Sequence, residues 1–207
     1  GMLARVPFAL VVAPGVQAGS PKEFVALARS SPGKVTFGSS GIGSPFHLAG
    51  EMLKSMAGID MLHVPYKGSG PVTTALLSGE VMSAFAPIGP FLQYIRSGKL
   101  RALGILNGYR TSILPDLATL EEALSLPGFA LDAWVGLLAP AGTRKTIVDR
   151  LNGEIVRIVR DPQFAKEHLL RHSYEPLGST PEEMSETMKA TLAVYAKIVR
   201  DARIVVD

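Results

Sequence analysis

The run of glycine and serine residues from 38 to 44 is the part of the sequence best suited to binding a ligand. It follows a short apolar run, residues 35–37, and precedes a stretch with helical periodicity, residues 46–56. A turn from a strand into a helix directs backbone N–H groups and the positive end of the helix dipole at one place. Glycines let a ligand approach the backbone, and serine hydroxyls add donors. The sequence therefore predicts a site for a small carboxylate or phosphate, with unpaired amides, built from Gly38, Ser39, Ser40, Gly41, Gly43 and Ser44.

Other interpretations of this turn stay open. The glycines can serve only to make a tight turn, and the serines only to cap the helix. Residues 39–43 also look like the nucleotide loop of short-chain dehydrogenases, but Phe37 stands where that loop has its first glycine, and no tyrosine is followed four residues later by lysine. The alternative to a carboxylate site is therefore an enzyme that uses residues 38–44 for a phosphate or nucleotide, and a third possibility is a chain without a ligand.

The histidines predict no metal site. His47 lies in the first turn of the helix after the loop, His63 lies in a strand, and His168 and His172 have the i, i+4 spacing of one helical face. No third ligand is close to that last pair in sequence, so both are expected at the surface. Cysteine and the motif Gly-x-Ser-x-Gly are absent, which excludes thiolate nucleophiles and the nucleophile elbow of α/β-hydrolases. We expect no catalytic residue and no cofactor.

The composition is that of an apolar, folded chain. Of the 207 residues, 47% are hydrophobic and 19% are charged, and the net charge is +3. The basic residues are scattered and form no stripe that could follow a phosphate backbone, so nucleic acid is not an expected partner. No apolar run reaches the roughly 18 residues that a membrane span needs. The chain shows no signal peptide, and Gly1-Met2 is expected to be a remnant of expression.

Strand-like and helix-like stretches alternate along the chain, which predicts an α/β fold. Strands are expected at residues 8–13, 35–37, 61–64, 81–86, 102–106, 133–139 and 174–177. Helices are expected after Ser20 and at residues 46–56, 71–77, 90–96, 120–124, 144–160, 162–170 and 181–199. The runs 35–37 and 61–64, separated by a helix, suit parallel strands buried on both faces. Capping boxes are expected from Ser20 to Glu23 and from Thr180 to Glu183.

Several sequence motifs resemble those of the substrate-binding receptors of tripartite tricarboxylate transporters, also called Bug receptors. They occur in the family's order over nearly the whole chain. The motifs are residues 32–44 (PGKVTFGSSGIGS), 47–52 (HLAGEM), 63–68 (HVPYKG), 97–103 (SGKLRAL), 114–116 (LPD), 136–142 (GLLAPAG), 161–162 (DP) and 178–183 (GSTPEE).

The resemblance implies a two-lobed α/β fold like that of type II periplasmic binding proteins. Residues 1–12 would be a crossover strand, residues 13–131 a complete central lobe, and residues 132–207 the C-terminal part of a second, incomplete lobe. A hinge is expected near Pro127-Gly128, where proline and glycine break a helix.

The resemblance also implies a function. The chain would be a periplasmic receptor and not an enzyme, and it would capture a small carboxylate between its lobes and deliver it to membrane permease subunits. Residues 38–44 would be the carboxylate clamp. Tyr66 and Lys67 follow a strand, at the end where α/β sheets place ligands. The remaining expected ligand-binding residues are His47 and Ala86.

The sequence departs from the family pattern in two ways. The βα units that build most of the family's first lobe are absent, so self-association is expected to cover an exposed apolar face, with Trp134 and Leu137 near the contact. Ser83 and Ala86 stand where many relatives have acidic residues. Without a carboxylate to pair with an ammonium group, the site should prefer an uncharged or purely acidic solute to an amino acid, provided that Asp60 and Glu80 face solvent.

Overall fold

The computed structural model describes residues 1–202 and 204, so four residues of the predicted C-terminal segment, 203 and 205–207, lie outside the described part. The chain forms two compact units. The large unit contains Phe8–Leu131 and the chain from Tyr195 onward, and the small unit contains Gly1–Pro7 and Asp132–Val194. Each expected strand is present, as is each expected helix except the one at residues 162–170, although several elements end at other residues.

The large unit contains a five-stranded sheet with the order β4-β3-β5-β2-β6. The strands are β2 (Phe8–Val12), β3 (Thr36–Ser39), β4 (Leu62–Pro65), β5 (Ser83–Pro87) and β6 (Arg101–Ile105). Strand β3 lies between β4 and β5 and is parallel to both, as expected for the runs 35–37 and 61–64, and β2 is antiparallel to β5 and β6. The carboxyl ends of β3, β4 and β5 therefore lie at one edge of the sheet. The expectation of burial on both faces was wrong for β4, because it is an edge strand with Leu62 and Pro65 exposed.

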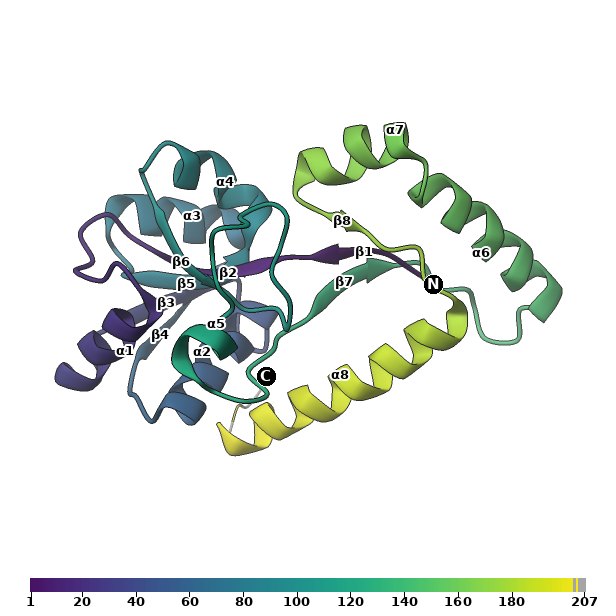
Figure 1. Cartoon of the computed structure of the whole chain (residues 1–207). Helices are drawn as coiled ribbons and strands as arrows, with labels where there is room; N and C mark the ends of the chain where they lie inside the picture. Colours follow the sequence, from purple (N-terminus) through teal and green to yellow (C-terminus); the bar gives the residue numbers. More distant parts are fainter. Residues whose placement is uncertain (203, 205–207) are drawn as a thin grey trace. The chain divides into compact units, whose positions relative to one another are not determined.

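Helices cover both faces of this sheet (Figure 1). On one face lie α1 (Pro21–Ser30), α2 (Pro45–Ala57) and α5 (Leu120–Leu124), and on the other lie α3 (Ser69–Ser78) and α4 (Ile88–Arg96). Three of the helices begin where a side chain accepts a backbone N–H, at Ser20, Ser44 and Thr119, and α1 and α2 then have proline in the first turn.

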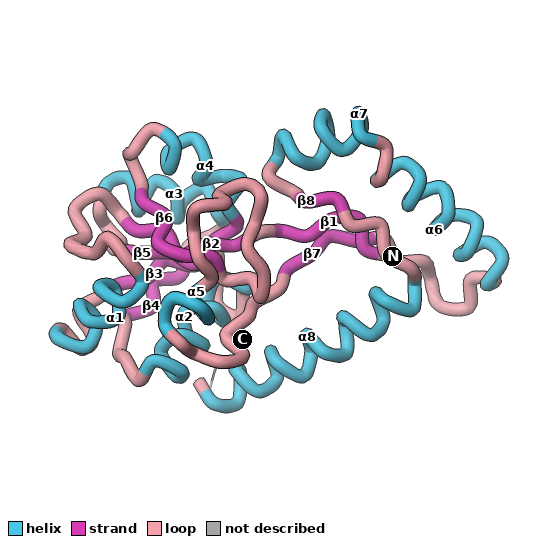
Figure 2. The backbone as a smooth tube through the Cα atoms, viewed as in Figure 1, coloured by secondary structure: helices cyan, strands magenta, loops and turns pink. Residues whose placement is uncertain are grey.

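The first strand of the sequence is divided by Pro7. Figure 2 shows β1 (Met2–Val6) and β2 as successive strands, but β1 pairs with β7 (Ala133–Gly136) and β8 (Glu175–Pro176) in the three-stranded sheet of the small unit. Proline has no N–H to donate to a sheet ladder, which makes residue 7 a natural point for the chain to leave one sheet and enter another. The strand expected from periodicity started at residue 8, whereas the crossover strand implied by the resemblance, residues 1–12, covered both β1 and β2 as one element.

The small unit contains the remaining helices, α6 (Lys145–Val159), α7 (Pro162–Phe164) and α8 (Pro181–Asp201), the last of which continues into the large unit. The expectation of a regular helix at residues 162–170 was wrong. After α7 the chain forms a π-helical turn, Ala165–Leu169, and a 3₁₀ turn, Leu170–His172, which ends at Ser173 in a left-handed conformation. None of the described helices is long and apolar enough to cross a membrane.

The two capping boxes have different outcomes. As expected, the Thr180 N–H donates to the Glu183 carboxylate at 2.8 Å, and the Glu183 N–H donates to the Thr180 hydroxyl at 3.1 Å. At the first helix, Ser20 accepts the N–H of Glu23, but the Glu23 carboxylate bonds to the N–H of Gly19 and not to that of Ser20.

The core of the large unit places Phe37 of β3 against helix α2. Phe37 is fully buried and meets Phe85 of β5 edge to face, with ring centroids 5.8 Å apart. Gly50 of α2 lies directly over the Phe37 ring, and a Cβ there would be 2.3 Å from a ring carbon. The absence of a side chain at residue 50 therefore sets how closely α2 approaches the sheet.

We expect Gly50→Ala to destabilise the protein by about 1–3 kcal/mol, because the added methyl group overpacks a rigid ring. The control is Gly153→Ala in α6, where an added Cβ meets nothing within 4 Å. That change should stabilise the helix by up to about 1 kcal/mol. Chemical denaturation measures both, and equal effects of the two substitutions would contradict the packing argument.

Candidate functional site

The turn from β3 into α2 is held in an unusual backbone conformation. Gly41 has φ +134° and Gly43 has φ +75°, a region that favours glycine. Ser39, the last residue of β3, is fully buried, and its carbonyl accepts the N–H of Tyr66 at 2.8 Å. The turn thus lies at the carboxyl edge of the parallel strands, as the sequence predicted.

Three of the amides in this turn already have partners within the protein. The Gly41 N–H donates to Ser39 Oγ at 3.2 Å, the Gly43 N–H to His47 Nδ1 at 3.1 Å, and the Ser44 N–H to the carbonyl of Gly41 at 3.2 Å. The expectation of a turn full of unpaired amides was therefore wrong for these residues. Two of them bond to side chains, those of Ser39 and His47, and the third bonds to a backbone carbonyl.

A smaller set of donors remains for a ligand. Within the described residues, the N–H groups of Ser40, Ile42 and Phe46 make no hydrogen bond, and the hydroxyls of Ser40 and Ser44 donate none. The first helical residue, Pro45, has no N–H, and the N–H of His47 reaches Ser44 Oγ at 3.4 Å. The turn can therefore offer an anion three amides and two hydroxyl donors beside the positive end of α2.

Two histidines pack behind the turn. The rings of His47 and His63 are almost parallel, with centroids 3.8 Å apart, and the centroid of the Phe37 ring lies 4.9 Å from that of His63 and 6.3 Å from that of His47. His63 Nε2 lies 2.6 Å from Ser39 Oγ in a hydrogen bond, and His47 Nε2 lies 3.8 Å from the Glu51 carboxylate. The sequence indicated both positions but gave no sign that the rings touch.

Both histidines are held in the neutral form. Burial, with contributions from the nearby His47 and Lys54, lowers the pKa of His63 from 6.5 to about 4. Burial also lowers the pKa of His47, although the Glu51 carboxylate acts in the opposite direction. Since His47 Nδ1 accepts the Gly43 N–H, we assign the proton of its neutral ring to Nε2.

Tyr66 supports the turn from the other face of the sheet. A Cβ at Gly38 would lie 3.4 Å from the Tyr66 ring and 3.3 Å from Val72 of α3, so glycine leaves room for both side chains. The Tyr66 hydroxyl donates to the Glu80 carboxylate at 2.7 Å. Desolvation and this hydrogen bond raise the pKa of Tyr66 to about 12. Glu80 is exposed, as the sequence analysis expected. Its hydrogen bond with Tyr66 was not expected.

The other expected site residues lie on the neighbouring strand ends. Lys67 directly follows Tyr66 and is exposed. Ala86, near the end of β5, is fully buried, as is Ser83, whose hydroxyl donates to the carbonyl of Thr36 at 2.9 Å. These two strand positions therefore contribute no charge to the core.

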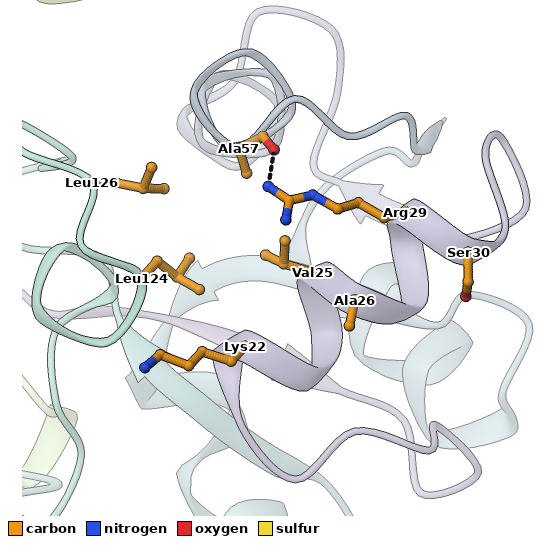
Figure 3. A pocket seen from close by; sticks show the side chains of 8 residues that line it. All are labelled: Lys22, Val25, Ala26, Arg29, Ser30, Ala57, Leu124 and Leu126. Atoms are coloured by element: carbon orange, nitrogen blue, oxygen red, sulfur yellow. Dashed lines mark hydrogen bonds between the residues drawn. The ribbon is translucent and has the colours of Figure 1, made fainter.

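The remaining histidines belong to the small unit, and a surface pocket of the large unit is lined by residues outside the turn. His168 and His172 are exposed, and the described residues include no group of three or more His, Asp or Glu side chains able to hold a metal ion. A pocket of about 540 Å³ lies between α1, the end of α2 and the residues around α5. Figure 3 shows Arg29 in this pocket, directed at the carbonyl of Ala57, to which it donates at 2.7 Å. Arg29 thus caps the last turn of α2.

Comparison with known proteins places this geometry in a family. A family model described as the tripartite tricarboxylate transporter family receptor matches residues 1–203. The UPF0065 protein of the tcbD-tcbE intergenic region of Pseudomonas sp. strain P51 is 33% identical over 203 residues, which are 98% of this chain and 60% of that protein. BugT of Bordetella pertussis is 32% identical over 200 residues, 97% of this chain and 61% of BugT. The chain thus spans about 60% of the length of these relatives.

Solved structures share the fold. Rpa4515 of R. palustris, solved with adipate, superposes with a TM-score of 0.87 at 30% identity, covering 98% of this chain and 67% of that one. MatC of Rhodopseudomonas palustris, solved with bound malate, gives 0.79 at 27% identity and coverages of 96% and 68%. The periplasmic binding protein BugD gives 0.83 at 29% identity and coverages of 99% and 68%. The expected periplasmic binding protein fold is confirmed over about two thirds of its length.

We expect the stability of the protein to fall as the pH decreases from 6.5 toward 4. The pKa of His63 is lower in the folded protein than its ordinary value of 6.5, so the unfolded chain binds more protons in this interval and is favoured by acid. Thermal unfolding at pH 7 and pH 4.5 measures the effect. His63→Gln should reduce the difference between the two melting temperatures, whereas His172→Asn, at an exposed histidine, should leave it unchanged.

Proposed function

The chain belongs to the tripartite tricarboxylate transporter receptor family, and on that premise we propose that it binds a small carboxylate solute at the turn between β3 and α2. One observation carries the proposal. The turn keeps three amides and two hydroxyls that donate to nothing among the described residues, at the start of a helix and at the carboxyl edge of three parallel strands.

The proposed solute is acidic. Two structural relatives were solved with dicarboxylates, adipate and malate. In this chain the fully buried Ser83 and Ala86 offer no carboxylate to a substrate ammonium group, and the Glu80 carboxylate accepts the Tyr66 hydroxyl. An amino acid would therefore bind with its ammonium group poorly compensated.

The proposed ligand-binding residues have different tasks. Ser40 and Lys67 present polar groups directly, while Ser39, His47 and Tyr66 hold the backbone in place. The full proposed set is the free amides of Ile42 and Phe46 together with the residues expected from the sequence, Gly38, Ser39, Ser40, Gly41, Gly43, Ser44, His47, Tyr66, Lys67 and Ala86.

The family and its structural neighbours are solute-binding receptors. By extension we propose that the full-length protein works without catalysis in the periplasm and delivers its solute to membrane permease subunits. Phosphate or nucleotide binding at residues 38–44, the enzyme alternative, has no further support in the geometry, since within the described residues no metal-binding cluster accompanies the turn.

Titrating the ¹⁵N-labelled chain with adipate, malate, glutamate and ADP tests the proposal. Adipate or malate should shift the amide signals of Ile42 and Phe46, and glutamate should bind more weakly. Gly41→Val should weaken binding at least tenfold, because a branched side chain at φ +134° distorts the turn. Gly142→Val, at φ +80° in open space in the small unit, is the control. Shifts caused by ADP alone would contradict a carboxylate receptor.

We also propose that this chain self-associates through the small unit. Helix α6 exposes an apolar stripe of Ile147, Leu151 and Ile158, whose side chains are 41, 54 and 40% accessible. The adjacent face of the helix, with Ile155 and Val159, packs in the core with Ala4. A second copy of the chain can cover the stripe, and Leu137, 53% accessible, extends the apolar surface after β7.

Sedimentation velocity at tens of micromolar should show dimers or larger species. Leu151→Glu should shift the chain toward monomer, because it places a charge within the stripe. Arg150→Glu puts the same side chain one position away on α6 and should have little effect. A monomeric unmodified chain would show that the exposed stripe does not mediate association.

A further inference from the structure

We propose that His47 and His63 are positioning residues that act as one neutral, stacked pair to hold residues 39–44 in shape. The inference deepens the proposed function, because the turn they hold is the proposed carboxylate site. Neither histidine needs to touch the solute for this role.

The two imidazoles hold opposite ends of the turn. His63 bonds to Ser39 Oγ at 2.6 Å, and the same oxygen accepts the N–H of Gly41 and donates to its carbonyl at 3.0 Å. His47 Nδ1 accepts the N–H of Gly43 at 3.1 Å. The turn therefore has one imidazole anchor at its start and one near its end.

Stacking couples these anchors to each other. The ring centroids are 3.8 Å apart with an interplanar angle of 9°, and Phe37 contacts both rings, with its centroid 4.9 Å from that of His63 and 6.3 Å from that of His47. Phe37 is itself pressed against Gly50 of α2, the helix that carries His47. A movement of either ring must therefore move the other.

The pair has these properties only when both rings are neutral. A proton on His47 Nδ1 would face the Gly43 N–H, so that two donors would oppose each other where a hydrogen bond now exists. Two imidazolium rings at 3.8 Å would also repel. The ionisable groups acting on the pair are Glu51 and Lys54 of α2, while β3 and β5 contribute none.

Nuclear magnetic resonance of the ¹⁵N-labelled chain tests the inference without a ligand. In the unmodified protein the amide signal of Gly43 should titrate together with the His47 ring nitrogens, at a pH below 6.5. His47→Phe keeps an aromatic ring but removes the acceptor, and it should speed hydrogen exchange at Gly43 at least tenfold at pH 7.

Conservative variants separate positioning from general packing. Asn places its side-chain oxygen near the position of Nδ1, so His47→Asn should restore slow exchange at Gly43 and abolish its titration. The Gly41 amide shares Ser39 Oγ with His63, so its signal should also depend on the protonation of His63. His63→Gln should remove that pH dependence while keeping a polar partner for Ser39. His172→Asn, at an exposed residue, is the control and should change neither signal.

The outcomes distinguish this inference from the proposed function. The positioning role would be overturned if the Gly43 amide signal did not change with pH and its hydrogen exchange did not change in His47→Phe, whether or not a carboxylate binds. A normal Gly43 titration with no response to adipate at pH 7 would instead support the positioning role and contradict carboxylate binding. If His47→Phe fails to fold, the titration in the unmodified chain and its loss in His47→Asn decide the question.

Discussion

The parallel pairing of β3 between β4 and β5 is the constraint on which the site depends. It brings three strand ends to one edge, so that residues following Ser39 and Pro65 become neighbours although they are far apart in the chain. The N–H of Tyr66 then extends the ladder to the carbonyl of Ser39 and joins the two loops. Register also places His63 opposite Phe37, which starts the stack of rings that ends at His47.

The two faces of β3 pack against different helices through adjacent residues. Phe37 points at α2 and requires Gly50 there, whereas Gly38 faces α3 and leaves room for Tyr66 and Val72. The alternation of side chains along a strand makes this division unavoidable. As a result, the helix that begins at the turn and the tyrosine that supports it are both positioned by a strand of four residues.

Local sequence patterns predicted most of the helices and strands. The features that the sequence analysis missed depend on contacts between residues far apart in the chain. Proline at the start of α1 and α2 and the serine caps fixed those helices, because capping is a matter of three or four neighbouring residues. The turn at residues 38–44 was also visible in composition. The bond from Tyr66 to Glu80, the stacking of His47 on His63 and the division at Pro7 depend on strand register and sheet membership, which spacing alone does not encode. The pairing of Gly43 with His47 was local but uses a ring nitrogen that no capping pattern predicts.

The structure of the turn also determines how the proposed site would stabilise the negative charge of a carboxylate. Ser39, His47 and the backbone carbonyl of Gly41 satisfy three amides, so the backbone of the proposed carboxylate site is already fixed and little ordering would remain on binding. The amides left over contribute partial charges, and Lys67, the nearest basic residue in the sequence after β4, is exposed. Partial charges on a rigid frame suit a solute whose carboxylate keeps some of its water. A buried lysine or arginine would instead have to be desolvated without its partner whenever the site is empty. Neutral imidazoles avoid that cost, because they support the frame without adding a charge that the empty site would have to bury.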